Sequence, residues 1–189
     1  FKGGDPEGEL AVRELTRKEK RTGTVIKWLP DLEVFTDIDI APDYFLDVMK
    51  RQAIVNAGVE FIFRNQNGKS FDTTTFNYVN GVVDHVAEII GEDALTGVQH
   101  WETEVKTRDR EDKPEYKCKM DVAVAFSNKV SATEYYHNSS WLEYGGAPDK
   151  AVRNAFVYQI DNYLKTNNKY NKTEKKINFD DVADCLVCV

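Results

Sequence analysis

The chain has 189 residues, of which 41% are hydrophobic and 12% aromatic, a composition typical of a globular protein with its own core. Its formal net charge of −7 argues against nucleic-acid binding through a surface that is basic all over. No apolar run approaches the roughly 20 residues that span a bilayer, and three cysteines give no disulfide framework, so we expect a soluble, cytoplasmic protein with no membrane partner.

The first 40 residues favour extended structure. Residues 9–16 and 22–29 predict two strands, which the charged turn 17–21 joins. The preceding residues 1–8 are rich in glycine and resemble a loop, and residues 30–40 form a connector.

Two helices and a hairpin are expected next. Pro42 can occupy the first turn of a helix, and apolar residues then recur at three- and four-residue spacing up to Gly58. Asn67-Gly68 is a strong hairpin signal between two segments rich in β-branched and aromatic residues. A second apolar stripe predicts a helix over residues 80–91.

The second half mixes strands and helices. In chain order we expect a strand at 98–105, a charged loop at 106–115, a long hairpin of 116–127 with 130–138, helices at 147–164 and 179–184, and a strand at 185–189. This order predicts an α+β or α/β domain with one layer of helices on a sheet.

Gly145-Gly146 precedes Pro148 and the longest predicted helix. Glycine permits the positive φ of a tight turn, which is a purely structural explanation for the pair. Alternatively, backbone N–H groups at the positive end of the helix could sense a phosphate. Arg153 on the same helix is either an ion-paired surface residue or a contact to a signalling loop.

A lysine-rich segment follows that helix. Glu174 is the only acidic residue among the five lysines, which are Lys165, Lys169, Lys172, Lys175 and Lys176. Such a run is either an ordinary solvated surface or a basic face that meets DNA phosphates. The same two interpretations apply to Arg13, Arg17 and Arg21.

Other reactive residues predict no site. Cys185 and Cys188 lie in an apolar strand without the four ligands of a zinc site, which favours core packing. His137 stands near Ser139 in sequence, but adjacency gives no triad geometry. We therefore expect neither a catalytic residue nor a metal site.

Two segments carry a resemblance to a known family. Asn138, Gly145, Gly146, Arg153 and Ala155 match a strand, a Gly-Gly turn and a helix opening of its members. The matches in residues 21–35 are Thr22, Gly23, Thr24, Pro30, Asp31, Glu33 and Phe35. Together these segments resemble the ATPase-side subunit of type IIA DNA topoisomerases, the gyrase B and topoisomerase IV B lineage.

The resemblance implies an arrangement of domains. Residues 1–35 would be the last strands of a GHKL ATPase domain and a connector. Residues 36–189 would be a transducer domain that stops before the family's Gln-Thr-Lys loop. Its implied fold is ribosomal protein S5 domain 2-like: α+β, with a left-handed βαβ crossover and a mixed sheet covered by helices on one face.

The resemblance also implies a function. The chain would be part of an ATP-hydrolysing type II topoisomerase, coupling ATP binding and hydrolysis to clamp closure and strand passage. ATP and Mg²⁺ would bind the full-length protein, and this fragment alone would be inactive and bind neither. Implied partners are double-stranded DNA, a DNA-cleaving A-type subunit in a heterotetramer and a second B-type subunit, in a nucleoid-associated cytoplasmic enzyme.

The resemblance singles out candidate residues. Asn138, Gly145, Gly146 and Arg153 would belong to the signalling loop and helix, and the five lysines would face DNA. The chain departs from the family at Tyr144, Ala147 and Pro148, so polar roles at these positions are not carried over. A non-topoisomerase relative with the same architecture, such as a MutL-like mismatch-repair or chaperone-like protein, is the alternative.

Overall fold

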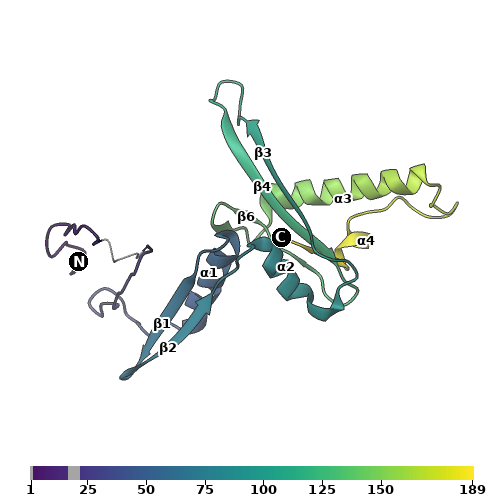
Figure 1. Cartoon of the computed structure of the whole chain (residues 1–189). Helices are drawn as coiled ribbons and strands as arrows, with labels where there is room; N and C mark the ends of the chain where they lie inside the picture. Colours follow the sequence, from purple (N-terminus) through teal and green to yellow (C-terminus); the bar gives the residue numbers. More distant parts are fainter. Residues whose placement is uncertain (1, 17–21) are drawn as a thin grey trace. The chain divides into compact units, whose positions relative to one another are not determined.

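The structure is a computed structural model that describes residues 2–16 and 22–189. The chain divides into two compact units, residues 1–41 and residues 42–189 (Figure 1). All helices and strands of the described residues belong to the second unit.

The first unit contains no helix or strand among its described residues, 2–16 and 22–41. Within these residues, Lys2 and Asp5 form an isolated antiparallel β-bridge. The strands expected at 9–16 and 22–29 are therefore wrong for this structure, and the turn expected at 17–21 lies outside the described residues. A strand needs a neighbouring strand for its backbone N–H and C=O groups, and no strand ladder is assigned to the described residues of these segments.

The second unit begins with a helix and a hairpin. Helix α1 spans Pro42–Val55, and strands β1 (Phe61–Asn67) and β2 (Ser70–Phe76) pair antiparallel. Asn67 lies opposite Ser70, so the hairpin closes in two residues, with Gly68 at a φ of 61°. All three expected elements are confirmed.

Helix α2 (Val82–Ile90) and the short 3-10 helix η1 (Gly91–Asp93) lead into a long ribbon. Strand β3 (Gln99–Thr107) pairs over its whole length with residues 116–124 of β4 (Tyr116–Phe126), and the charged loop lies between them. Only the last residues of β4, from Val124 to Phe126, also pair with another strand. The outer part of the ribbon therefore extends from the sheet (Figure 1).

The main sheet has the strand order β3-β4-β8-β5. Strand β8 (Leu186–Cys188) pairs antiparallel with β4 and parallel with β5 (Ala132–Thr133), so the sheet is mixed, as expected. The expected hairpin between residues 116–127 and 130–138 is wrong. The last strand of the chain lies between those two segments and takes their hydrogen bonds.

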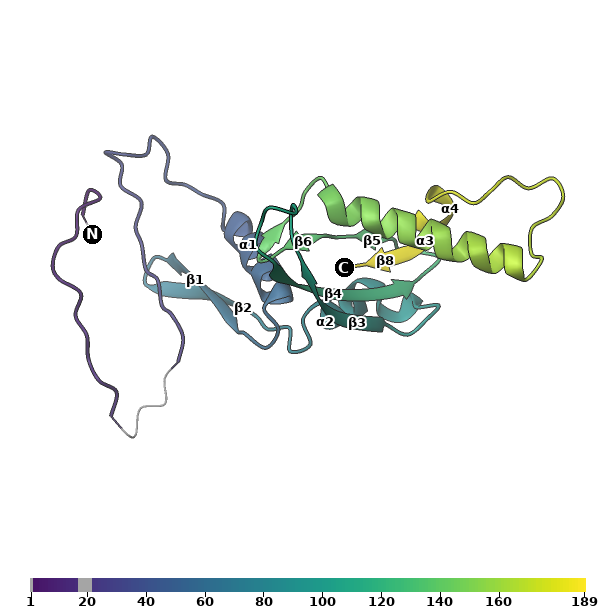
Figure 2. The same cartoon turned by 90° about the horizontal axis from the view of Figure 1, so that it is seen from above.

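Helices cover both faces of this sheet, in contrast to the single layer predicted from the sequence. Along β4, Ala123 and Ala125 belong to a core cluster with α1 and α2. Val124 belongs to a second cluster, which packs against helices α3 (Gly146–Thr166) and α4 (Asp180–Ala183). Figure 2 shows α2 and α3 on opposite sides of the strands. Successive strand residues point to opposite faces, so a nearly continuous apolar run indicates two covered faces.

The position of β8 generates a test of the core. Leu186 is fully buried, so Leu186→Ala should destabilise the protein by about 2–5 kcal/mol through lost burial and a residual cavity. Leu95, whose side chain is 61% exposed, supplies the matched control Leu95→Ala. Urea unfolding of both variants should show a clear loss of stability in the first only. Equal losses would contradict the assignment of β8 to the core.

Candidate functional site

The Gly145-Gly146 turn connects a small hairpin to α3. The hairpin consists of β6 (Tyr136–His137) and β7 (Ser140–Trp141). Gly145 and Gly146 have φ angles of 70° and 64°, which favour glycine. Their N–H groups donate to the carbonyls of Leu142 (2.9 Å) and Tyr144 (2.7 Å). Both donors are thus used within the turn, and in this conformation neither is offered to a phosphate.

The two glycines differ in their surroundings. A Cβ atom at Gly145 would lie 2.6 Å from the Cβ of Asp149 and 3.5 Å from the ring of Tyr135. At Gly146 the nearest heavy atom would be 3.9 Å away, in Pro148. Gly145 therefore combines a special backbone conformation with close packing, whereas Gly146 has only the first constraint.

Asp149 links this turn to the rest of α3 and to α4. Its carboxylate oxygens accept hydrogen bonds from the Nε of Arg153 at 3.0 and 2.8 Å. The guanidinium of Arg153 lies 4.4 Å from the ring centre of Phe179, at the start of α4. Burial, together with the nearby Asp149 carboxylate, raises the pKa of Tyr135 to about 12. Tyr135 therefore stays protonated and neutral beside the turn.

Asn138 occupies a different place from the other predicted residues. It lies with Ser139 in the two-residue loop between β6 and β7, where its φ is 54°. Asparagine tolerates this left-handed conformation better than most residues. The structure thus brings Gly145, Gly146 and Arg153 together at the start of α3, with Asn138 at the tip of the preceding hairpin.

A buried histidine, which no sequence pattern singles out, contacts the residue just before the β6–β7 hairpin. His85 on α2 is 5% exposed, and its Nε2 lies 3.2 and 3.1 Å from the two carboxylate oxygens of Glu134. Glu134 also accepts a hydrogen bond from the hydroxyl of Tyr136, at 2.8 Å. The hydrogen bond with His85 and that from Tyr136 hold the pKa of Glu134 below its usual value despite burial. The carboxylate is therefore charged and fixed in place.

A second carboxylate faces the other side of the same ring. Glu88 Oε2 lies 3.6 Å from His85 Nδ1, and it accepts a hydrogen bond from Tyr78 at 2.5 Å. Lys50 of α1 binds the other oxygen of Glu88 at 2.8 Å. These contacts lower the pKa of Glu88 although burial acts in the opposite direction. No sequence spacing signalled this network, because its members come from separate elements.

The five candidate lysines separate into two groups. Asp161, which is 4% exposed, accepts Lys165 at 2.7 Å and Tyr170 at 2.9 Å, and lies 3.5 Å from Lys176. The pair of Lys165 and Asp161 lies within α3, whereas Tyr170 and Lys176 hold the segment after α3 against the helix. Among the five candidate lysines, Lys165 and Lys176 are the ones with ion pairs in the part of the chain that the structure describes.

The remaining three lysines, Lys169, Lys172 and Lys175, are exposed. The neighbouring acid Glu174 accepts hydrogen bonds from the backbone and side chain of Asn171, at 2.9 and 2.7 Å. Its carboxylate is therefore turned to the local backbone, and the outward charge of the segment is positive. Of the N-terminal basic residues, Arg17 and Arg21 lie outside the described residues.

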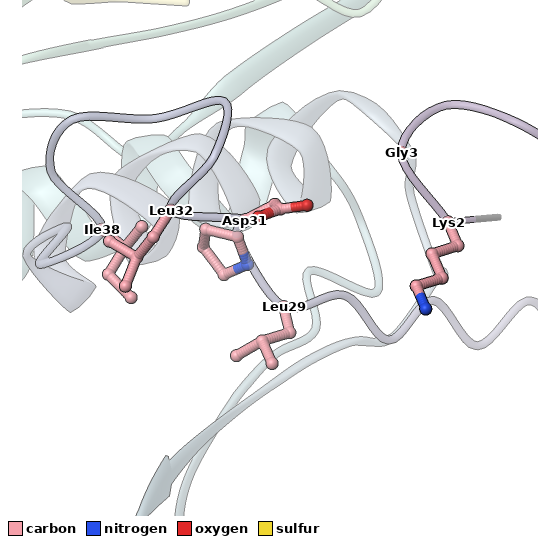
Figure 3. A pocket seen from close by; sticks show the side chains of 7 residues that line it. Lys2, Gly3, Leu29, Asp31, Leu32 and Ile38 are labelled. Atoms are coloured by element: carbon pink, nitrogen blue, oxygen red, sulfur yellow. The ribbon is translucent and has the colours of Figure 1, made fainter.

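A pocket is present in the first unit (Figure 3), with a cavity volume of about 490 Å³. Its lining residues are Lys2, Gly3, Leu29, Pro30, Asp31, Leu32 and Ile38. The carboxylate of Asp31 accepts the N–H of Glu33 at 2.9 Å, which is a local turn contact. The lining therefore offers no arrangement of acid, base and nucleophile.

The described residues contain no group of three or more metal-binding side chains and no helix long and apolar enough to cross a bilayer. All three cysteines are free. Burial raises the pKa of Cys188 to about 11, so its thiol stays protonated in the core.

Comparison with known proteins gives a consistent result. A sequence model of the family DNA gyrase B matches residues 77–189. The gyrase B protein of Mycoplasma genitalium is 27% identical over 197 residues, which cover 99% of this chain and 29% of that protein. The B-type subunit of DNA topoisomerase 4 from Enterococcus faecalis is 27% identical over 100 residues, covering 52% of this chain and 14% of that protein.

A solved structure supports the same fold. The 43K ATPase domain of Thermus thermophilus gyrase B, in complex with an aminocoumarin, superposes with a TM-score of 0.56 and 20% identity. The match covers 84% of this chain and 41% of that one. The chain spans about 29% of the length of its Mycoplasma relatives.

The different surroundings of the two glycines lead to a prediction. Gly146→Ala should cost about 1–2 kcal/mol, because only the left-handed backbone is strained. Gly145→Ala should cost more, because its Cβ also overlaps Asp149. The unfolding midpoint in urea should fall in both variants, and further in Gly145→Ala. An equal fall of the midpoint in both variants would show that the close contact with Asp149 does not add to the loss of stability.

Proposed function

The chain belongs to the DNA gyrase B family, and we propose that it is the transducer region of an ATP-dependent type IIA DNA topoisomerase. In this role it couples ATP binding and hydrolysis to closure of the DNA clamp and to strand passage. The observation that carries the proposal is the family match over residues 77–189, which includes the Gly145-Gly146 turn and all of α3.

The proposal extends to the domains. Residues 1–35 are the last strands of a GHKL ATPase domain with a connector, and residues 36–189 are the transducer up to the Gln-Thr-Lys loop. The strands of residues 1–35 would form on a sheet that other parts of the ATPase domain provide. Parallel pairing of β5 with β8, with α3 between them in sequence, fits a βαβ unit of the S5 domain 2-like kind, whose crossover we propose to be left-handed.

The complete protein in this proposal hydrolyses ATP with Mg²⁺ and acts on double-stranded DNA. It assembles with a DNA-cleaving A-type subunit and with a second B-type subunit, in the cytoplasm at the nucleoid. The identities of the relatives support this: they are subunits of DNA gyrase or topoisomerase 4, and the solved neighbour is an ATPase domain. In this proposal the described residues of this chain have a mechanical part and not a catalytic one.

Within the transducer, we assign signalling to the Gly145-Gly146 turn and Arg153. Both glycine N–H groups are bonded inside the turn, so the signal is carried by backbone conformation rather than by direct phosphate binding. Arg153 then transmits a shift of the turn to α4 through Asp149 and Phe179. Asn138 holds the hairpin that leads into the turn.

Gly146→Ala in the complete protein tests this role. Strain of about 1.4 kcal/mol on the active conformation should lower ATP turnover about tenfold, with a smaller effect on nucleotide affinity. Gly68→Ala is the matched control, because its φ is 61°, its Cβ would meet no heavy atom within 4 Å, and it lies in the β1–β2 hairpin. Steady-state turnover and equilibrium nucleotide binding should be measured for both variants. If Gly146→Ala hydrolyses ATP as fast as the parent protein, the signalling role is rejected and the glycines are ordinary turn residues.

We also propose that the lysine-rich segment faces DNA, with Lys169, Lys172 and Lys175 as phosphate contacts and Lys165 and Lys176 as anchors on Asp161. Phosphate contacts carry no sequence information, so binding should be weak and independent of sequence. Three contacts predict a slope of log affinity against log salt of about −2.7.

Fluorescence anisotropy with duplex DNA at low salt measures this slope. Reversal of Lys169, Lys172 and Lys175 to glutamate should remove most of it. The same reversal of Lys106, Lys113 and Lys119, three exposed lysines on or near the β3–β4 ribbon, should have a smaller effect and controls for net charge. A slope that survives the first reversal and not the second would place DNA on the ribbon instead.

A further inference from the structure

The β6–β7 hairpin that leads into the Gly145-Gly146 turn is separate from the main sheet. Its strands pair with each other and form a two-stranded sheet of their own. The N–H of Leu142 donates to the carbonyl of Tyr135 at 2.8 Å and closes the base of the hairpin, and the N–H of Gly145 donates to Leu142 at 2.9 Å. The N–H of Glu134, just before β6, donates to the carbonyl of Cys188 in β8 at 2.9 Å, which ties the incoming end of the hairpin to the main sheet. The loop and the outgoing strand have no ladder to that sheet in the described chain, and side chains contribute to their position.

Two consecutive residues of α1 supply such side chains. The Nε2 of Gln52 donates to the carbonyl of Ser139, in the hairpin loop, at 2.6 Å. The guanidinium of Arg51 lies 3.6 Å from the ring centre of Trp141, on the outgoing strand. Arg51 is itself held by Asp47, one turn earlier on α1, at 3.0 Å. A guanidinium over the face of an indole is a favourable cation–π contact.

The stem of the hairpin is held from a different helix. Glu134, just before β6, is fixed by His85 of α2 and by the hydroxyl of Tyr136. The incoming side of the hairpin is therefore attached to α2, and its loop and outgoing side to α1.

Helix α1 also contacts the β1–β2 hairpin. The rings of Phe45 on α1 and Phe63 on β1 are stacked with their centres 5.5 Å apart. The same helix thus has one aromatic contact to the β1–β2 hairpin and two polar contacts to the β6–β7 hairpin. This arrangement makes α1 a rigid connection between two hairpins that share no strand pairing.

We propose that Arg51 and Gln52 are positioning residues of the Gly145-Gly146 turn, which they hold through Trp141 and Ser139. Their effect on ATP turnover rests on the proposed function of the transducer. The positioning itself is a property of this chain and is measurable without nucleotide. The two ideas can therefore fail separately.

Hydrogen exchange of the 189-residue chain tests the positioning. In Arg51→Ala and in Gln52→Met, the amides of Leu142 and Gly145 should exchange about tenfold faster, because the hairpin opens locally once one attachment is lost. The amide of Ala123, bonded to Val189 at 2.9 Å in the core sheet, should keep its protection. A variant that merely lowered global stability would accelerate all three amides together.

Arg64→Ala is the matched control. It removes a guanidinium that lies 4.5 Å from the ring centre of Phe71, which is the same kind of contact in the β1–β2 hairpin. It should leave the amides of Leu142 and Gly145 unchanged. Arg51→Lys keeps the charge and the partner Asp47 but loses the flat stack, and should give an intermediate rate.

A double-mutant cycle completes the test. If Arg51 acts through Trp141, combining Arg51→Ala with Trp141→Ala should accelerate exchange at Gly145 no more than the stronger single change. Unchanged exchange at Leu142 and Gly145 in the single variants, or fully additive effects in the cycle, would overturn the proposal. If the Arg51 and Gln52 variants exchange faster but Gly146→Ala has normal ATP turnover, the positioning role stands and the signalling function is rejected.

Discussion

The insertion of three residues, Leu186–Cys188, between β4 and β5 is the constraint on which the second unit depends. Val187 enters the core cluster of α1 and α2, whereas Leu186 and Cys188 enter that of α3 and α4. One short strand thus completes both cores and the hydrogen bonding of two neighbours. Its partners are far away in sequence. The sheet is therefore complete only when residues 186–188 have paired with β4 and β5, which is a contact of high sequence separation.

That closure also determines where the site lies. Strand β5 is fixed by β8, and the hairpin, the glycine turn and α3 follow it along the chain. Helix α3 returns the chain across one face of the sheet, and Asp161 binds Tyr170 and Lys176 of the following segment, which leads back to α4. The turn is therefore held at the start of a helix whose far end is anchored by a buried carboxylate.

Local signals predicted local structure well. Pro42, Asn67-Gly68 and the apolar stripe before Gly91 placed α1, the first hairpin and α2 correctly. Pairing was not predictable in the same way, since nothing near Asn128-Lys129 indicates that β8 separates the two flanking segments. The grouping of Gly145, Gly146 and Arg153 was expected from the resemblance to the family, whose motif these residues match. The contacts of His85 and Arg51 join different elements, and only the folded chain brings them together.

The long ribbon of β3 and β4 has a consequence for solubility. Strand β3 is an edge of the sheet, and an uncovered edge offers backbone donors and acceptors to strands of other molecules. His100, Glu102, Glu104 and Lys106 alternate along it, and they face charged partners such as Asp121 and Lys117. A second ribbon approaching this edge would have to bring like charges together or strip them of water. The charged side chains on one face of the ribbon thus oppose fibre-like association at its open edge, where exposed Trp101 and Val105 alternate with them.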